Sequence, residues 1–361
     1  MSSLFHTISI REVIQETPDA STIVFDIPTA LQAAFAYQSG QYITVSVMIN
    51  GKEERRAYSF CSSPHTNQYP AITVKKVDDG RVSPYMNDIL KAGDTIQLMP
   101  PLGKFTANMD ANNRKHYVLF GGGSGITPVM SILKSVLHQE PNSRISLVYA
   151  NRDEASIIFN QELKTLVAEQ GGRLEIIHCL ENATADFAGF SGRPTVMDYQ
   201  QITRKIWSDG WENEYFICGP GGMMDAVKNA LEGLNIPATQ IHTEYFSTPV
   251  SPASESDAAA GQSAGKEPFE GSTQATILFN GKEFQIEISE GTTILEAAKD
   301  QNVDPPYACQ MGVCTTCRAK LLSGSAHMDE REGLSDAEID EGYILTCQAH
   351  ATSAKIKLIY E

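Results

Sequence analysis

Four cysteines near the end of this 361-residue sequence have the spacing of an iron–sulfur ligand set. Cys309, Cys314 and Cys317 follow the pattern C-x4-C-x2-C, and Cys347 comes much later. Four thiolates bind the two irons of a [2Fe–2S] cluster with this spacing, three from one wrapped loop and one from a distant segment. Gly312 suits such a loop, because the backbone must approach inorganic sulfide closely and can need a positive φ there. We therefore expect these four cysteines to be metal ligands.

Structural zinc is the main alternative for these cysteines. Cys314 and Cys317 form a C-x2-C pair, and His350 follows Cys347 at C-x2-H. Zinc sites usually come as two short ligand pairs, however, and have no use for a C-x4-C arm. A Rieske centre would place two histidines on one iron. The spacing therefore favours the all-cysteine cluster.

A second motif is suited to the phosphates of a nucleotide. The apolar stretch 116–120 leads into Gly121-Gly122-Gly123-Ser124-Gly125-Ile126-Thr127-Pro128, and a helix is expected over 128–137. A strand, a glycine loop and a helix bring backbone N–H groups against a pyrophosphate. The loop departs from G-x-G-x-x-G at Pro128, a residue that a helix start tolerates. Glycine-rich turns also serve structure, so the loop alone does not decide the function.

Two motifs in the first hundred residues fit a flavin nucleotide. Arg56, Tyr58 and Ser59 offer a cation for a pyrophosphate, a ring to cover an isoalloxazine and a donor for a reactive nitrogen. Gly80-Arg81-Val82-Ser83 precedes an expected helix, whose N-terminal dipole could hold a pyrophosphate. Each motif is short, and the alternative is a surface strand with one packed tyrosine.

These motifs need elements to hold them, and the pattern of the chain predicts several domains. Residues 1–110 contain short β-branched or alternating segments separated by turns, which predicts an antiparallel β-barrel with one helix. Its expected strands are 4–14, 22–27, 41–49, 71–77 and 95–99, and its expected helix is 84–90. Residues 111–246 alternate strands with helices, which predicts an α/β domain with a parallel sheet. The expected strands there are 116–120, 145–149, 174–179 and 214–218, and the expected helices are 128–137, 155–169, 195–200 and 222–234.

The last part of the chain divides into a linker and a third domain. Residues 247–272 are rich in Ser, Ala, Gly, Pro and Glu, which predicts a flexible linker. Residues 273–361 carry the four spaced cysteines and an acidic run over 329–341. That run is either a solvated face or a docking surface for a basic partner.

Composition excludes several classes of function. A net charge of −16 argues against a nucleic-acid partner, which would require a surplus of Lys and Arg. No apolar run is long enough to span a bilayer, and the N-terminus has no signal-peptide pattern, so we expect a cytoplasmic protein without a membrane partner. The remaining cysteines, Cys61, Cys179 and Cys218, are odd in number and widely spaced. They make a poor disulfide framework, which fits a reducing compartment.

Two parts of the chain, the expected third domain and the two domains before it, resemble known families. Residues 273–361, including Leu345-Thr346-Cys347-Gln348-Ala349-His350, resemble plant-type ferredoxins, which implies an α+β β-grasp domain. The flavin motifs, Pro101–Phe105, the Cys218-Gly219-Pro220 turn and Glu244-Tyr245-Phe246 resemble the ferredoxin–NADP reductase superfamily. This likeness implies a flavin in the barrel 1–110, either FAD or FMN, with the aromatic-ended Glu244-Tyr245-Phe246 favouring FAD, and it implies NADPH or NADH in the domain 111–246.

The resemblance also implies roles for individual residues. It places Cys218 beside the nicotinamide, Glu244 near the flavin edge, and Phe246 over the flavin ring until the nicotinamide displaces it. Ser59, Cys218 and Glu244 are the implied catalytic residues. The implied cofactor-binding residues are Arg56, Tyr58, Ser59, Lys75, Gly80, Val82, Ser83, Gly122, Gly123, Ser124, Gly125, Thr127, Pro128, Arg152, Gly219, Pro220 and Phe246.

The domain order resembles the reductase components of bacterial oxygenase systems, with the phenylacetyl-CoA epoxidase reductases as the nearest group. This likeness implies that electrons pass from NAD(P)H through FAD and the cluster to a terminal oxygenase or hydroxylase. A flavin is needed because a nicotinamide gives two electrons and the cluster takes one. Alternatives are a reductase for a hybrid-cluster protein, a steroid hydroxylase or a desaturase. A stand-alone diaphorase or redox sensor, and a zinc-stabilised binding module on a reductase, are others.

The choice between NADPH and NADH depends on the residues after the strand 145–149. Arg152 could meet a 2′-phosphate, whereas Asp153 could accept a hydrogen bond from a 2′-hydroxyl. The residues leave both open, and only the family likeness favours NADPH.

Overall fold

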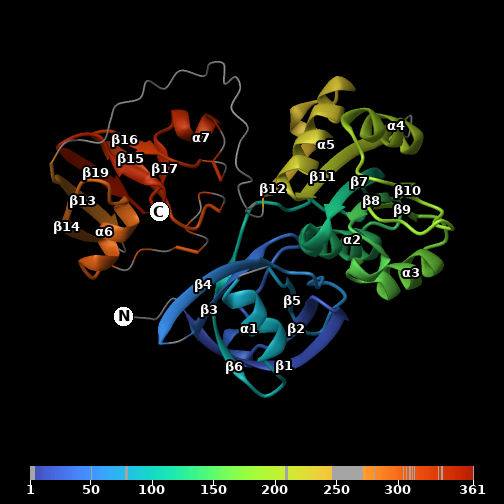
Figure 1. The fold of residues 1–361 in the computed structure, drawn as a ribbon, viewed down its shortest axis with the longest axis horizontal. Helices are drawn as coiled ribbons and strands as arrows, with labels where there is room; N and C mark the ends of the chain where they lie inside the picture. The colour runs from blue at the N-terminus through green and yellow to red at the C-terminus, as the bar shows by residue number, and fades with distance from the viewer. Residues whose placement is uncertain are drawn as a thin grey trace. The chain divides into compact units, whose positions relative to one another are not determined.

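The computed structural model describes residues 5–49, 51–77, 80–207, 210–245, 271–279, 281–303, 305, 307, 308, 310, 312, 314–331, 333, 334 and 336–360. The chain divides into two compact units, residues 1–246 and 247–361 (Figure 1). Phe246, Cys309 and most of the expected linker lie outside the described residues. Within the described residues, no helix is long and apolar enough to cross a membrane.

The first half of unit one is an antiparallel barrel. Its sheet has the order β4-β3-β6-β1-β2-β5. The strands are β1 (His6–Thr17), β2 (Ala20–Asp26), β3 (Tyr42–Ile49), β4 (Lys52–Ser59), β5 (Ala71–Lys75) and β6 (Thr95–Leu102). Alternation along β1 buries Ile8 and Ile10 between exposed neighbours, as a sheet with one face in a core requires. The predicted antiparallel barrel is confirmed.

The α-helix of the barrel, α1 (Val82–Asp88), begins earlier than the predicted 84–90. Val82 and Met86 are buried in the barrel core, which draws the start of the helix toward the turn before it. Pro84 then falls in the first turn, where a missing N–H costs nothing. Val82 and Ser83 are therefore part of the helix rather than a segment that precedes it.

The second half of unit one is a parallel sheet covered on both faces (Figure 1). Its order is β10-β9-β8-β7-β11-β12. The strands are β7 (Lys115–Gly122), β8 (Arg144–Asn151), β9 (Leu174–Leu180), β10 (Phe190–Ser191), β11 (Glu212–Gly219) and β12 (Ile241–Tyr245). Helices α2 (Ile126–Gln139) and α3 (Asn160–Glu169) share one apolar core with the sheet, and α4 (Val196–Ile206) and α5 (Gly221–Gly233) share another. The predicted parallel α/β domain is confirmed.

The predicted helix over 155–169 is wrong in its first part. A 3-10 turn at Glu154–Ser156 is followed by the buried apolar stretch 157–159, and α3 begins only at Asn160. Phe159 has a φ of 62°, a conformation that aromatic residues rarely adopt. Asp153 caps the turn through reciprocal hydrogen bonds with its last residue. This cap and the burial of three apolar side chains outweigh the local helical pattern.

Hydroxyl groups join the barrel to α2. Ser39 Oγ donates to Ser135 Oγ at 2.5 Å, and Ser63 Oγ lies 2.7 Å from the same oxygen. Ser131 Oγ donates to the carbonyl of Ser62 at 2.6 Å. All five residues are buried. Paired polar groups in a dry interface have few alternative arrangements, so they fix the barrel against the nucleotide domain.

Unit two is a small α+β domain. Its mixed sheet has the order β14-β13-β19-β15-β17. The strands are β13 (Thr273–Phe279), β14 (Lys282–Ile288), β15 (Arg318–Ser323), β17 (Tyr343–Leu345) and β19 (Lys355–Ile359), with β16 (Ala326–Met328) and β18 (Ala349–Ala351) as a separate pair. Helix α6 (Ile294–Asp300) buries Ile294, Ala297 and Ala298 in the core of this sheet, and α7 (Asp336–Asp340) lies next to β17. The predicted β-grasp class is confirmed.

Candidate functional site

Two glycine loops meet at the carboxyl ends of β7 and β11, the edge where a parallel sheet of this type presents its ligand crevice. A Cβ at Gly125 would overlap the carbonyl group of Cys218. A Cβ at Gly122 would lie 2.5 Å from Met223 Sδ and 2.7 Å from Pro220 Cδ. Glycine is therefore required at both positions, and the contact brings the predicted Gly122 and Gly125 against the predicted Gly219–Pro220 turn.

The conformation of the first loop is held by side chains behind it. Gly123 has a φ of 51°, and the Tyr149 hydroxyl donates to its carbonyl at 3.2 Å. Thr127 Oγ1 donates to the Ser124 carbonyl at 3.1 Å, and Pro128 is buried in the first turn of α2. The Thr127 hydroxyl therefore shapes the loop. The N-terminus of the fourteen-residue α2 follows at once, which fits a nucleotide pyrophosphate.

The three predicted catalytic side chains come from three strands. Ser59 ends β4, and Cys218 of β11 is paired with Glu244 of β12 in the parallel register. Ser59 Oγ lies 3.4 Å from Glu244 Oε2, and Ser59 and Cys218 are both buried. A residue of the barrel and two residues of the nucleotide domain therefore meet at the junction between them.

The protonation of this junction follows from its burial. Burial raises the pKa of Glu244 to about 8, and the hydrogen bond from Ser59 opposes this rise. Burial also raises the pKa of Cys218, and the nearby Glu244 carboxyl adds to the effect. At neutral pH we therefore expect a neutral carboxyl and a neutral thiol. Glu244 can hold a proton here, whereas Cys218 lacks the depressed pKa of a nucleophilic thiolate.

The raised pKa of Glu244 predicts how stability depends on pH. Between its ordinary value of 4.5 and its folded value of about 8, the native chain keeps a proton that the unfolded chain releases. The contribution of Glu244 to the free energy of unfolding is thus complete below about pH 4.5, declines as the pH rises, and is lost above about pH 8. A Glu244→Gln variant should lose this decline in urea unfolding measured across that range with saturating FAD. The exposed Glu232→Gln variant is the control, and an unchanged decline in Glu244→Gln would contradict the assignment.

Arg56 and Tyr58 lie on the same face of β4, together with Glu54. Arg56 Nη1 is 3.5 Å from Glu54 Oε2, and Arg81 Nη1 is 2.8 Å from Glu54 Oε1. Burial raises the pKa of Tyr58, and Arg56 opposes that rise. The predicted cation and ring therefore share one face with a carboxylate and with a second guanidinium.

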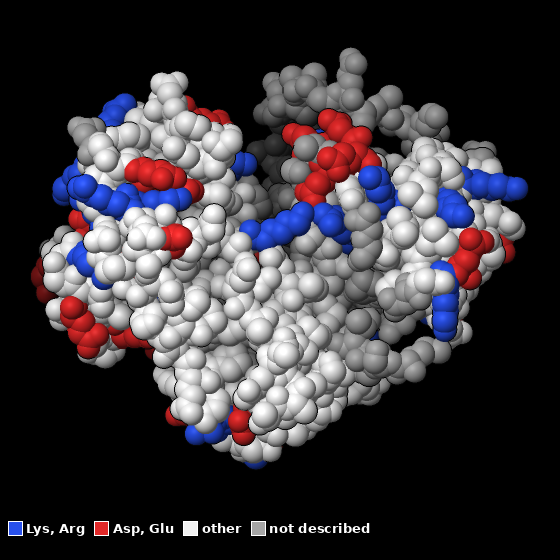
Figure 2. Space-filling model, turned by 180° about the vertical axis from the view of Figure 1, so that it is seen from behind, with Lys and Arg blue, Asp and Glu red and all other residues white. Residues whose placement is uncertain are grey.

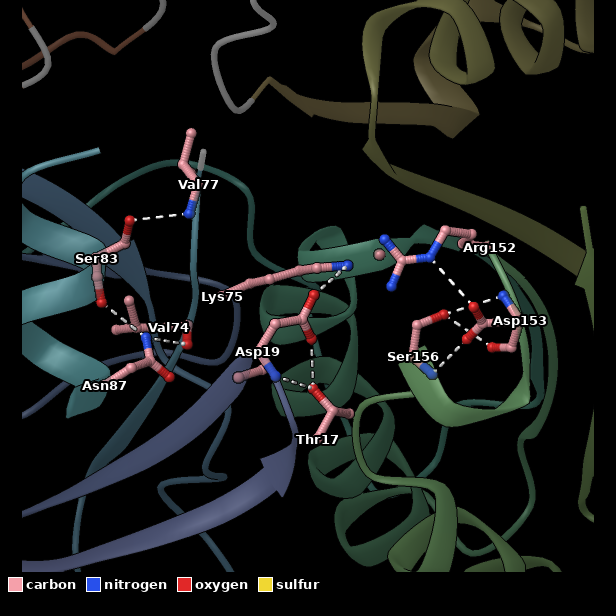
Figure 3. Close-up of polar contacts among 12 residues, drawn as sticks. Thr17, Asp19, Val74, Lys75, Val77, Ser83, Asn87, Arg152, Asp153 and Ser156 are labelled. Carbon is pink, nitrogen blue, oxygen red and sulfur yellow. Dashed lines mark hydrogen bonds and ion pairs between the residues drawn. The ribbon is translucent and has the colours of Figure 1, made fainter. Parts of the chain in front are cut away.

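Side-chain hydrogen bonds fix the turn before α1. Ser83 Oγ accepts from the Val77 N–H at 3.0 Å, and Asn87 Nδ2 donates to the Ser83 carbonyl at 2.8 Å (Figure 3). A Cβ at Gly80 would lie 2.9 Å from the Val77 carbonyl oxygen, so this close approach requires glycine. The Ser83 hydroxyl therefore orders the turn. Of the expected flavin-binding residues, Gly80 lies in this turn, and Val82 and Ser83 begin α1 directly after it.

Lys75 of β5 and Arg152, just after β8, point toward one another from the two halves of unit one (Figure 3). Each is paired with a neighbouring carboxylate. Lys75 Nζ lies 3.6 Å from Asp19 Oδ2, and Arg152 Nε donates to Asp153 Oδ2 at 3.1 Å. The second oxygen of Asp153 accepts from the Ser156 N–H at 2.9 Å. The Asp153 carboxylate is thus engaged in its own turn.

Three of the four predicted cluster ligands lie in the described part of the chain, and Cys309 does not. Cys317 and Cys347 are buried in one apolar cluster, and Cys314 is half-buried. Gly312 has a φ of 75°, and a Cβ there would lie 2.7 Å from the Glu330 side chain. Two buried thiols and a glycine-dependent loop fit a thiolate-held cluster. Among the described residues, which omit Cys309, no group of three or more His, Cys, Asp or Glu side chains is arranged to hold a metal ion.

The zinc alternative depended on His350. Its Nε2 lies 3.0 Å from Asp329 Oδ2, in the pair of strands β16 and β18. Metal-bound histidines commonly have a carboxylate on their other ring nitrogen, so this contact by itself does not exclude His350 as a zinc ligand.

A hydrogen-bond chain supports the ligand segments. Tyr360 Oη donates to Thr346 Oγ1 at 2.9 Å, and Thr346 Oγ1 donates to the carbonyl of Cys317 at 3.0 Å. Thr346 and Tyr360 are buried. Sequence reasoning missed these two residues, and the position of Thr346 directly before Cys347 was the only local signal.

Acidic side chains gather over α7 in unit two (Figure 2). The Asp336 side chain is 94% exposed, whereas that of Glu338 is 19% exposed and accepts from Arg318 Nη1 at 2.6 Å. The Arg318 guanidinium also lies 4.6 Å from the ring centroid of Tyr343. Glu338 therefore attaches α7 to the sheet and does not belong to an exposed acidic face. The rest of the face remains compatible with solvation or docking.

Comparisons with known proteins agree with this arrangement. Family models match an oxidoreductase FAD-binding domain at residues 7–107, an oxidoreductase NAD-binding domain at 119–229 and a 2Fe-2S iron–sulfur cluster binding domain at 277–352. The chain is 34% identical to a component of the 1,2-phenylacetyl-CoA epoxidase of Escherichia coli (strain K12), over 96% of this chain and 94% of that protein.

Two further relatives share the full architecture. The ferredoxin reductase component of 3-ketosteroid-9-alpha-monooxygenase from Rhodococcus rhodochrous is 34% identical, over 97% of this chain and 95% of that protein. Among solved structures, phthalate dioxygenase reductase is similar with a TM-score of 0.61 and 25% identity, over 99% of this chain and 98% of that one. The likeness therefore extends across both compact units.

Proposed function

Because this chain belongs to the family of reductases that join FAD-binding, NAD-binding and 2Fe-2S domains, we propose that it supplies electrons from NADPH to a terminal oxygenase. It is an NAD(P)H-dependent oxidoreductase, and its cofactors are FAD, a nicotinamide nucleotide and a [2Fe–2S] cluster. The proposed acceptor is an oxygenase of the phenylacetyl-CoA epoxidase type. This assignment rests on one observation: the likeness to the 1,2-phenylacetyl-CoA epoxidase component covers 96% of this chain and 94% of that protein, so all three domains are shared.

The residues of the site support electron transfer from a nicotinamide. Bound FAD takes two electrons together and gives them up singly, and the cluster accepts one at a time. The loop Gly121–Gly125 and the N-terminus of α2 would bind the nucleotide phosphates, and Arg56 the flavin diphosphate. Ser59 would donate a hydrogen bond at the junction, where Glu244 holds a proton and Cys218 provides a small uncharged wall.

The preference for NADPH is proposed from the turn after β8. Both carboxylate oxygens of Asp153 have partners, Ser156 N–H and Arg152 Nε, so Asp153 is less suited to accept from a ribose 2′-hydroxyl. The Arg152 side chain is 60% exposed. A guanidinium with this exposure suits a 2′-phosphate.

An Arg152→Ala variant should therefore discriminate between the nucleotides. The KM for NADPH should rise about 10- to 150-fold, since a charge-assisted contact contributes ~1.5–3 kcal/mol. The KM for NADH should change little. Steady-state reduction of ferricyanide with each nucleotide measures both. Arg204→Ala, in the last turn of α4 at the opposite edge of the sheet, is the control. Equal effects on NADPH and NADH would contradict the assignment.

The acceptor is tested by reconstitution. The purified holoprotein and NADPH are combined separately with the oxygenases of the phenylacetyl-CoA and 3-ketosteroid systems, and the product formed per NADPH oxidised is measured. We expect the highest coupling with the phenylacetyl-CoA epoxidase. Coupling to neither of them, with normal ferricyanide reduction, would favour the diaphorase or redox sensor.

A further inference from the structure

One half-buried carboxylate, that of Glu54, links two guanidinium groups beside the flavin motif. Glu54 Oε1 accepts from Arg81 Nη1 at 2.8 Å, and Glu54 Oε2 lies 3.5 Å from Arg56 Nη1. The Glu54 side chain is 13% exposed, that of Arg56 is 36% exposed and that of Arg81 is 64% exposed. Each carboxylate oxygen thus faces one cation, and the group of three carries a net charge of one positive unit.

Local structure places these three side chains together. Residues 54 and 56 of β4 point to the same face because side chains alternate along a strand. Arg81 is the residue before the first turn of α1, which is anchored in the barrel core by Val82 and Met86. The anchored helix therefore carries the Arg81 guanidinium to Glu54.

The Arg81 guanidinium is weakly committed to this pair. In the described part of the chain, its side chain makes one hydrogen bond, the bond to Glu54, out of the five that a guanidinium can donate. Exposed ion pairs stabilise proteins little, because water and salt screen them. The remaining donors of Arg81 are therefore available to an anion that also meets Arg56.

We propose that Arg81 is a second ligand of the FAD diphosphate, and that Glu54 is the positioning residue that holds Arg56 and Arg81 at the spacing of two linked phosphates. The proposal rests on the flavin site described above, in which the Arg56 side chain and the N-terminus of α1 were expected to meet the diphosphate and the Arg81 side chain had no assigned role. A diphosphate offers acceptor oxygens on two linked phosphate groups to the two guanidiniums, whereas FMN offers those of one phosphate. The pair of arginines therefore favours FAD over FMN.

Flavin binding by the full-length apoprotein tests this proposal without activity. Dissociation constants for FAD, FMN and riboflavin are measured from flavin fluorescence in wild type, Arg81→Ala, Arg81→Lys and Glu54→Gln. Arg81→Ala should weaken FAD binding about tenfold or more, affect FMN less, and leave riboflavin unchanged. It should also lower the salt dependence of FAD binding. Arg81→Lys should recover part of the loss. Lys91→Ala is the matched control, because Lys91 is an exposed barrel cation paired with Asp94 at 3.0 Å.

The result for Glu54 separates positioning from repulsion. If Glu54 is a positioning residue, the Glu54→Gln variant should bind FAD severalfold more weakly than the wild type. The Glu54→Asp variant should lose less FAD affinity than Glu54→Gln does. Tighter FAD binding in Glu54→Gln would overturn this role, because the carboxylate would then oppose the diphosphate.

Two further outcomes would overturn the role of Arg81. An FAD dissociation constant within twofold of the wild type in Arg81→Ala would remove it as a ligand. Equal weakening of FAD and riboflavin would show that Arg81 only supports the fold. A wild-type protein that fails to bind FAD would instead overturn the flavin assignment itself, so the two failures are distinguishable.

Discussion

A Cys317→Ser variant should keep NADPH–ferricyanide reductase activity while losing transfer to any acceptor that needs the cluster. Cys317 is 1% exposed and shares an apolar cluster with Cys347, so serine there removes one thiolate and leaves a buried hydroxyl. Mutation of groups that only support metal ligands typically lowers metal affinity or activity about 10–100-fold, and loss of a ligand itself should have a larger effect. The flavin and nucleotide halves belong to the other compact unit and should fold normally.

The measurement has two parts. Iron and sulfide content and the visible spectrum report the cluster, and flavin content reports the barrel. Ferricyanide reduction, which flavin can perform directly, is compared with reduction of the oxygenase partner. Cys179→Ala removes a buried cysteine of the nucleotide domain and should spare the cluster. If both activities fell while the flavin was retained, the cluster would not be the acceptor of electrons from the flavin, and the proposed order of transfer would be wrong.

Features of the chain that depend on neighbouring residues could be predicted from the sequence. The cysteine spacing, the glycine loop and the alternation of strands with helices each lie within a short segment. The patterns of strands, turns and helices were sufficient for the antiparallel barrel and the parallel sheet, whereas the β-grasp class came from the resemblance of the cysteine segment to plant-type ferredoxins. Gly125 illustrates why, because a loop that touches another backbone requires glycine whatever surrounds it.

Features that depend on distant contacts could not be predicted in this way. The link between Glu54 and Arg81 needs β4 and α1 to be packed together, and neither residue has a local motif. Phe159 adopts a left-handed conformation with its side chain buried in the apolar core, three residues after the turn that Asp153 caps. The local pattern favoured a continuous helix there, and tertiary packing prevailed.

The meeting of Ser59 with Glu244 lies between these cases. The two residues belong to different strands and are 185 positions apart in the sequence, so only the family resemblance associated them at the sequence level. The physical reason is visible in the sheet. Glu244 of β12 is paired with Cys218 of β11. Ser59, the last residue of β4, lies next to Glu244 where the barrel meets the nucleotide domain. Their catalytic roles stay a prediction that the variants above can test.

A Gly125→Ala variant should lose nucleotide binding while keeping its flavin and its cluster. The added Cβ would overlap the carbonyl group of Cys218. The atoms that it would meet belong to the backbone, so no flexible side chain can move aside to relieve the clash. The glycine loop must move away from the Cys218–Gly219 turn, and overpacking of this kind costs about 1–3 kcal/mol. A displacement of about 1 Å at a reacting centre can reduce the rate about 100-fold. We therefore expect kcat/KM for NADPH to fall by about that factor, with KM raised.

Gly222→Ala is the matched control for this loop effect. Gly222 lies in the first turn of α5 and a Cβ there would meet no atom within 4 Å, so alanine fits and suits the helix. Titration with NADP⁺ measures nucleotide binding, and ferricyanide reduction measures turnover. If Gly125→Ala bound the nucleotide as tightly as Gly222→Ala does, the contact between the two loops would not be what shapes the nucleotide site. The phosphates would then be held by residues elsewhere, with Arg152 the first to examine.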